Sequence, residues 1–287
     1  MSEAIKRKIE NLALSEPIQL GSVDFTVNNP ELLMRQLGPV FSYFGRVEHE
    51  VSTDPLTTMM PRLGTEYKGY KSHGTDFLDI WVPQEKAHGD IFDGLQMEIG
   101  QKPADYDASV SRRDRLVGAM GRLSSSVHGV FEMLYLARGA MHERLTFQGC
   151  DLMADKFKTL GEEALLQTMI LPIRVQEAMH LGYYRAAAKE LKQHLEPWQL
   201  WLARKLSLAT YAPVGAESEA DKPDFGEVAS TLAGDKIDDF SNPIQAIAQD
   251  LLNSEGSKIL PKFVLKAITS CVDAQSEHNR RSLKLAA

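Results

Sequence analysis

The segment WVPQEKAHGD, residues 81 to 90, places Glu85 and His88 three positions apart in a stretch with helical periodicity. On a helix, residues three apart lie about 60° apart around the axis and about 4.5 Å along it. A glutamate and a histidine at this spacing therefore point towards one place. A carboxylate can bind one cation or bridge two, and a neutral imidazole can fill a terminal position on a metal.

A second segment, LPIRVQEAMHLGYY at residues 171 to 184, repeats the spacing with Glu177 and His180. The chain has eight histidines. At average glutamate usage, roughly half a Glu-x-x-His pair is expected among them by chance. Two such pairs, each on an expected long helix, favour a metal site.

The remaining chain is also dominated by helical periodicity, with little alternation of the kind that strands show. Helices are expected at about 30–51, 75–98, 114–160, 162–195, 197–211, 243–253 and 257–283. Gly38 and Pro39 are expected to kink or divide the first of these, and Pro172 is expected to bend the fourth. Between 212 and 243, Pro, Gly, Ser and Asp predict a surface loop. The prediction is an all-α fold in a single domain over 1–287, with a core bundle at 30–211 and additional C-terminal helices at 243–283.

Composition narrows the classes of function. The formal net charge of −7 argues against a general affinity for nucleic acid, which needs basic surface to neutralise phosphates. The two cysteines, Cys150 and Cys271, are too few for a disulfide framework and fit a reducing cytosol. The first residues carry no signal-peptide pattern, and the apolar runs are too short to cross a bilayer. We therefore expect a cytoplasmic protein without a membrane segment.

Di-iron carboxylate bundles supply a template for the rest of the site. In them, two helices each contribute one glutamate and two others each contribute Glu-x-x-His. Glu48 and Glu50 are the candidates ahead of the first pair. Glu48 follows Phe44 by four residues and lies on the apolar stripe of its helix, whereas Glu50 points away from that stripe. Glu48 is the preferred choice.

For the glutamate between the two pairs, Glu143 is preferred. Glu132 is the weaker alternative, and Glu162 and Glu163 look like residues of a first helical turn. His142, next to Glu143, is rotated by about 100° and points elsewhere. The expected metal ligands are Glu48, Glu85, His88, Glu143, Glu177 and His180. Carboxylate and imidazole donors of this mixture suit two iron ions, or an iron and manganese pair.

Three short segments resemble the soluble acyl-carrier-protein desaturases. WVPQEKAHGD resembles the family's W-x-x-E-E-x-x-H-G-D, HERLTF at 142 to 147 resembles Q-E-R-A-T-F, and QEAMH at 176 to 180 resembles D-E-K-R-H. The likeness runs in order over about 30–210 and is specific in these segments alone. Gln176 departs from it, because the family has an acidic residue there that orients an imidazole.

The resemblance implies a ferritin-like four-helix bundle in which the six ligands hold two irons that activate dioxygen as a co-substrate. It implies that Thr146 lies beside the oxygen-binding face as a catalytic residue. It also implies a ferredoxin-type electron donor, a homodimer, and an acyl thioester of acyl carrier protein or coenzyme A as substrate, with basic clusters at 112–115 and 279–281 as docking points. The reaction is desaturation, hydroxylation or another oxidation. The alternative is a non-catalytic metal-binding or interaction protein that retains the bundle.

Overall fold

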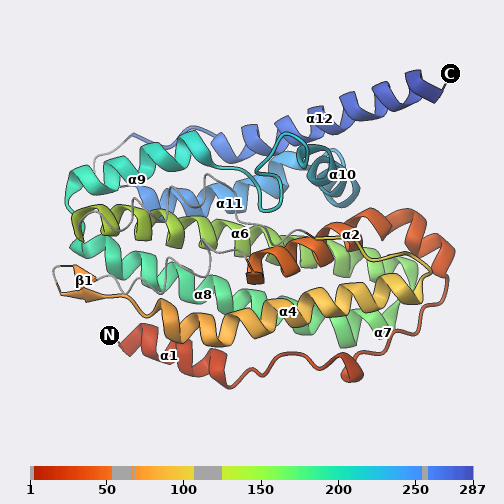
Figure 1. The fold of residues 1–287 in the computed structure, drawn as a ribbon, viewed down its shortest axis with the longest axis horizontal. Coiled ribbons are helices and arrows are strands. Elements are labelled where there is room, and N and C mark those ends of the chain that lie inside the picture. The colour runs from red at the N-terminus through yellow and green to blue at the C-terminus, as the bar shows by residue number, and fades with distance from the viewer. Residues whose placement is uncertain (1–2, 54–65, 68, 107–124, 254–257, 287) are drawn as a thin grey trace.

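The computed structural model describes residues 3–53, 66–67, 69–106, 125–253 and 258–286. Within these ranges the chain is almost entirely helical, which confirms the predicted all-α class (Figure 1). The strands described are β1 (Glu66–Tyr67) and β2 (Tyr70–Lys71), which pair antiparallel as a short hairpin. None of the described helices is long and apolar enough to cross a membrane.

Four long helices build the centre of the molecule: α2 (Pro30–Thr53), α4 (Gly74–Glu98), α6 (Ser125–Leu160) and α8 (Leu171–His194). The closest packing is between α6 and α8 and between α2 and α4. These two pairs lie against each other in Figure 1, and α4 also contacts α8. The description of this arrangement as a ferritin-like four-helix bundle stays a prediction.

The apolar stripe predicted on α2 faces the core. Of its seven members, Val51 is partly buried and packs against the core, and the other six are buried: Leu33, Leu37, Val40, Phe41, Phe44 and Val47. The helix continues as one element through Pro39, so the expected division does not occur. Gly38 leaves room at this point for Gln101, whose amide nitrogen donates to the Gly38 carbonyl oxygen at 3.0 Å.

Helix α6 is the central element of the fold. Between 127 and 160 its exposed residues are Asp155, Lys158 and Thr159, all close to its end, so other elements cover most of the helix. It packs on α8, on α9 (Pro197–Thr210) and on α11 (Ile237–Leu252). Its end at Leu160 matches the prediction, whereas the predicted start near 114 lies outside the described residues.

The predicted helix at 162–195 is present, but its first turns are irregular. It begins as α7 (Glu163–Leu165), continues as the π-helical segment η2 (Leu166–Ile170) and then becomes α8. Pro172 stands directly after the π-helical segment. Because proline has no N–H to donate to the preceding turn, the change of helix type occurs where the regular hydrogen-bond ladder is interrupted.

The loop predicted at 212–243 is wrong over much of its length. Helix α10 (Lys222–Ala233) occupies its middle and α11 begins at Ile237. The turn-like composition of this segment did not predict the short amphipathic helix. Pro223 lies in its first turn, where the backbone N–H has no partner within the helix and its absence costs no hydrogen bond. The buried face of α10 packs on α12 (Phe263–Ala286), so close that a Cβ on Gly226 would come within 2.2 Å of the Cys271 carbonyl oxygen.

The N-terminal residues form a helix that the sequence patterns did not predict, α1 (Glu3–Ala13). It packs against α8 and α4, and Ile5 and Leu12 are its buried residues. An irregular segment follows it along the outside of the helices and leads to α2 (Figure 1). Through this packing, the residues after α1 lie against the two helices that carry the Glu-x-x-His pairs.

Candidate metal centre

The four central helices bring all six predicted ligands together. Glu48 comes from α2, the first Glu-x-x-His pair from α4, Glu143 from α6 and the second pair from α8. None of the six residues exposes more than 6% of its surface. They form two overlapping groups whose ligand atoms lie within 4.8 Å of one another: Glu48, Glu85, His88 and Glu177 in one, and Glu85, Glu143, Glu177 and His180 in the other.

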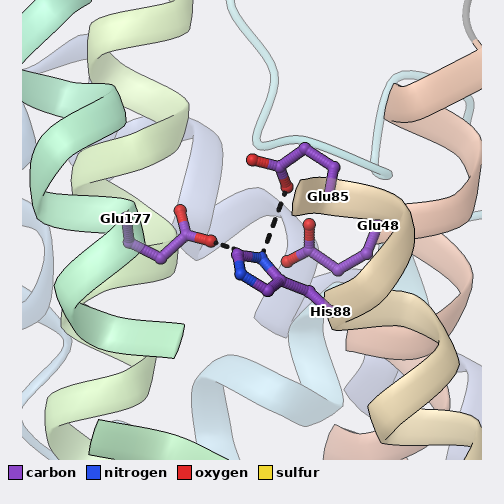
Figure 2. A group of neighbouring side chains, drawn as sticks. All are labelled: Glu48, Glu85, His88 and Glu177. Atoms are coloured by element: carbon purple, nitrogen blue, oxygen red, sulfur yellow. Dashed lines mark ion pairs between the residues drawn. The ribbon is translucent and has the colours of Figure 1, made fainter. Parts of the chain in front are cut away.

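Figure 2 shows the first group around the imidazole of His88. His88 Nδ1 lies 3.0 Å from Glu177 Oε1 and 3.8 Å from Glu85 Oε2. Glu48 approaches from α2 on the same side. Glu50, the alternative, instead pairs with Arg46 at 3.0 Å on the outer side of α2. The structure therefore favours Glu48 over Glu50.

The second group is built in the same way around His180. Its Nδ1 lies 2.9 Å from Glu85 Oε1, 3.5 Å from Glu143 Oε2 and 3.8 Å from Glu177 Oε2. Glu85 and Glu177 therefore belong to both groups and offer one oxygen to each histidine. Two shared carboxylates between two terminal imidazoles are an arrangement that can hold two neighbouring cations.

Several of these atoms lack the hydrogen bonds that buried polar atoms normally have. Glu85 Oε1, Glu177 Oε1 and the Nδ1 atoms of His88 and His180 are shielded from solvent and have no well-aligned hydrogen-bond partner. Leaving such atoms unpaired costs free energy. His88 Nδ1 lies 3.0 Å from Glu177 Oε1, and His180 Nδ1 lies 2.9 Å from Glu85 Oε1, so one cation at each pair would satisfy the two atoms of that pair. This is the observation that fits the residues to a metal centre.

Two of the four carboxyl groups favour the protonated form. Burial raises the pKa of Glu48 well above its ordinary value of 4.5, and the charge of Glu85 and a hydrogen bond with it add to the rise. Burial likewise raises the pKa of Glu143 well above 4.5, with the charge of Glu177 as the next cause. Carboxylates this close cannot all be ionised without a compensating charge.

The two shared carboxyl groups favour the ionised form. For Glu85, burial acts to raise the pKa, but the hydrogen bond with Glu48 and the charge of His180 outweigh it and lower the pKa well below 4.5. For Glu177, burial and the charge of Glu85 act to raise the pKa, while contacts with His180 and His88 lower it. The anionic charge of the site is therefore concentrated on the shared pair.

Both histidines favour the cationic form. Burial acts to lower the pKa of His88, but the contacts with Glu177 and Glu85 raise it to about 9. For His180 burial again acts to lower the pKa, and the charge of Glu85 with the contact to Glu143 raises it well above 6.5.

Without a cation, the directions of these pKa shifts favour two imidazolium ions, two carboxylates and two neutral carboxyl groups, a combination with zero net charge. The metal-loaded form balances equally well. Four ionised glutamates carry −4 and two divalent cations carry +4, with both imidazoles neutral. A buried site of this kind avoids an uncompensated charge in either form. The residues present therefore match two divalent cations in number, in charge and in donor type.

Trp81, Thr146 and His142 lie near the predicted ligand Glu143, in space or along the chain. The indole Nε1 of Trp81 donates to Glu143 Oε1 at 3.1 Å, a contact that the sequence did not predict. Thr146 lies on α6 one turn after Glu143 and is buried. Its predicted catalytic role stays a prediction. His142 points elsewhere, as expected, and its Nε2 lies 3.3 Å from the Ala212 carbonyl oxygen.

Gln176, at the position where the resembling family is acidic, lies 2.8 Å from His88 Nε2 through its Oε1. Gln84 makes the equivalent contact with His180 Nε2 at 2.7 Å. Sequence reasoning singled out Gln176 but missed Gln84. The available signal was that a glutamine directly precedes the glutamate in both Glu-x-x-His pairs.

Comparison of the sequence with models of known protein families and with curated proteins gives no match. The resemblance to the acyl-carrier-protein desaturases therefore rests on the three short segments alone. The geometry of the site, which does not depend on that resemblance, carries the functional argument.

Proposed function

We propose that this protein is a di-metal oxidoreductase that uses dioxygen to oxidise an apolar substrate. The supporting observation is the convergence of four glutamates and two histidines, all buried, from four helices onto one place. Iron, or iron with manganese, held by these six residues would supply the oxidising power that side chains lack. Cys150 and Cys271 stand outside both groups, which argues against a thiolate-bound structural zinc site.

The protein's own contribution is to fix the ligands and exclude water. Glu143 is held by the indole of Trp81, and Phe77 stacks on Trp81 with ring centroids 5.9 Å apart. The ring of Tyr183 also stacks on Phe77, with ring centroids 3.9 Å apart. His180 meets both Phe77 and Trp81 edge-on at 6.4 Å. An apolar wall of this kind keeps water from competing with the substrate and strengthens the electrostatic interactions inside the site.

Thr146 is the residue proposed to handle a proton beside the centre. It lies three positions after Glu143, so both residues share one face of α6. Its hydroxyl can both donate and accept a hydrogen bond, which a proton carrier requires. The resemblance of HERLTF to the desaturase segment supports the same role.

Substrate and partners rest on the resemblance. We propose an acyl thioester of acyl carrier protein or coenzyme A as substrate, a ferredoxin-type electron donor, and a homodimer in the cytoplasm. Of the two basic clusters expected to dock the carrier, 112–115 lies outside the described residues. The other, residues 279–281, is exposed on α12, where an acidic partner would compete with Glu277 for Arg280 and Arg281.

Oxygen consumption by iron-loaded protein tests the proposal. Protein reconstituted anaerobically with ferrous iron is supplied with a chemical reductant and acyl thioesters, and uptake is followed with an oxygen electrode. We expect uptake that depends on iron and rises with substrate. Glu85→Ala should abolish it, while Glu50→Ala, on the outer side of α2, should leave it intact. Stable iron binding with no uptake by any acyl thioester would favour the non-catalytic alternative.

A further inference from the structure

Each histidine of the candidate metal centre is tied to a glutamine on the opposite helix. His88 on α4 contacts Gln176 on α8, and His180 on α8 contacts Gln84 on α4. Both contacts use Nε2 of the ring and Oε1 of the amide. The two contacts cross between the helices, so they also set how α4 and α8 face each other at the site.

The orientation of both amides is fixed from the other side by the chain after α1. Gln176 Nε2 donates to the Glu16 carbonyl oxygen at 2.8 Å and to Ser15 Oγ at 3.1 Å. Gln84 Nε2 donates to the Ser15 carbonyl oxygen. A carbonyl oxygen can only accept a hydrogen bond, so each amide must turn its nitrogen outward and its oxygen towards the imidazole.

This orientation dictates the state of each ring. An amide oxygen only accepts, so the imidazole must donate from Nε2–H. In the neutral ring the lone pair is then on Nδ1, the atom that faces Glu177 in His88 and Glu85 in His180. A chain of hydrogen bonds therefore runs from the main chain of residues 15 and 16 to Nε2 of each imidazole, on the opposite side of the ring from the metal-facing Nδ1.

We propose that Gln84 and Gln176 are positioning residues of the metal centre, and that the main chain at Ser15–Glu16 sets them. They hold His88 and His180 in the tautomer that presents Nδ1 to a metal ion. This inference rests on the proposed metal centre, but it does not depend on oxygen chemistry.

The neutral amide suits the charge of this site. Both glutamines are buried, and four carboxyl groups already surround the two imidazoles. A carboxylate in place of each amide would add two further negative charges to a centre whose four carboxylates two divalent cations would balance without them. The amide accepts from Nε2–H without that charge.

The anchor of Gln176 lies at the protein surface. A cavity of about 410 Å³ is lined by Ser15, Glu16 and Gln176, with Ile18, Leu171 and Val175 as apolar neighbours. Water that enters this cavity would compete for the polar atoms of the amide. The two anchoring contacts of Gln176, on Ser15 Oγ and the Glu16 carbonyl, keep its oxygen turned towards His88 despite that access.

The test uses zinc, which binds the same donors without redox chemistry and leaves the protein visible to NMR. Gln84→Leu and Gln176→Leu are compared with Gln96→Leu, a buried glutamine of α4 whose amide nitrogen donates to Phe92 and Asp93 of its own helix. Long-range ¹H–¹⁵N spectra of zinc-loaded wild-type protein should show zinc on Nδ1 and a proton on Nε2 of both rings. Each leucine variant at the site should bind zinc about 10–100-fold more weakly. The control should bind as wild type does.

One conservative variant separates the two functions of the Gln176 amide, which accepts from His88 and donates to Ser15 and Glu16. Gln176→Glu keeps an acceptor for His88 but cannot donate to Ser15 and Glu16. We expect the His88 Nε2–H to stay protected from exchange, while main-chain amides of residues 14–19 exchange faster. Zinc on Nε2, or leucine variants with the zinc affinity of Gln96→Leu, would overturn the proposal.

If no zinc binds at all, the metal centre itself is wrong, and the metal-free protein decides the remaining claim. The Nε2–H protons of His88 and His180 should be protected from exchange with solvent in the wild type. In the leucine variants this protection should be lost. Equal exchange in both would overturn the positioning role. Zinc binding that depends on both glutamines, together with an absence of oxygen uptake by the iron form, would contradict only the proposed function.

Discussion

Trp81 Nε1 donates a hydrogen bond to Glu143 Oε1 over 3.1 Å, which links a buried aromatic residue of α4 to the ligand that α6 contributes. Removal of this donor by Trp81→Phe should weaken metal binding about 10–100-fold, because Glu143 loses the contact that orients it. The free energy of unfolding should fall by about 1–3 kcal/mol. Metal titration and urea denaturation measure the two effects. Trp201→Phe, at an exposed position on α9, is the matched control. Unchanged affinity in Trp81→Phe would reduce the contact to ordinary packing.

Metal binding should release protons at neutral pH. The metal-free cluster favours protons on Glu48, Glu143, His88 and His180, and metal ligation requires all four groups to lose them. We expect the binding of two divalent cations at pH 7 to release more than one proton, because the pKa shifts of all four groups favour their protonated forms. The release should shrink above pH 9, where His88 has already lost its proton. Calorimetry in buffers of different ionisation enthalpy counts the protons. A release of one proton or none would contradict the charge balance described for the site.

His142 should make stability depend on pH independently of the metal. Burial and the charge of Arg138 lower its pKa to about 3, against which the contact with the Ala212 carbonyl acts weakly. In the unfolded chain His142 binds a proton as the pH falls below about 6.5, whereas in the folded chain it stays neutral down to about pH 3. The contribution of His142 to the free energy of unfolding is therefore complete above pH 6.5 and is lost as the pH falls towards 3. Urea denaturation of metal-free protein at pH 7.5 and pH 5 should show a smaller difference for His142→Gln than for wild type. An equal difference would mean that His142 is not neutral in the folded state.

Thr146→Val tests the proton-handling role. Valine has nearly the same shape as threonine but no hydroxyl, so metal content and thermal stability should stay close to wild type. The variant should still consume oxygen. A smaller fraction of the oxygen consumed should appear as oxidised substrate, and a larger fraction should appear as hydrogen peroxide. Thr159→Val serves as a control, since Thr159 is an exposed residue near the end of the same helix. Product and peroxide yields that match the wild type would assign Thr146 a structural role only.

Contacts within one helix were predictable from the sequence, because the helical repeat fixes which residues are neighbours. Glu85 with His88, Glu177 with His180, and Glu48 on the apolar stripe of α2 all follow from that repeat. The buried stripe of α2 and the bounds of α4 agree with the structure for the same reason.

Contacts between helices were not predictable in this way. Gln84 meets His180 across 96 positions, and Trp81 meets Glu143 across 62, and both depend on how whole helices pack. The role of Ser15 depends on α1, a short helix that gains its stability from packing rather than from its own sequence. The helix α10 was missed because its turn-like composition outweighed a brief amphipathic pattern.

The most direct test of the account is the number of metal ions that one chain binds. Protein is reconstituted anaerobically with ferrous iron, freed of excess, and analysed for iron by elemental analysis, with Glu85→Ala and His180→Ala beside wild type. The account predicts about two iron ions per wild-type chain and loss of most of the iron in both variants, with helical content unchanged. Wild-type protein without iron, or variants that retain it in full, would show that the four glutamates and two histidines do not form a metal centre.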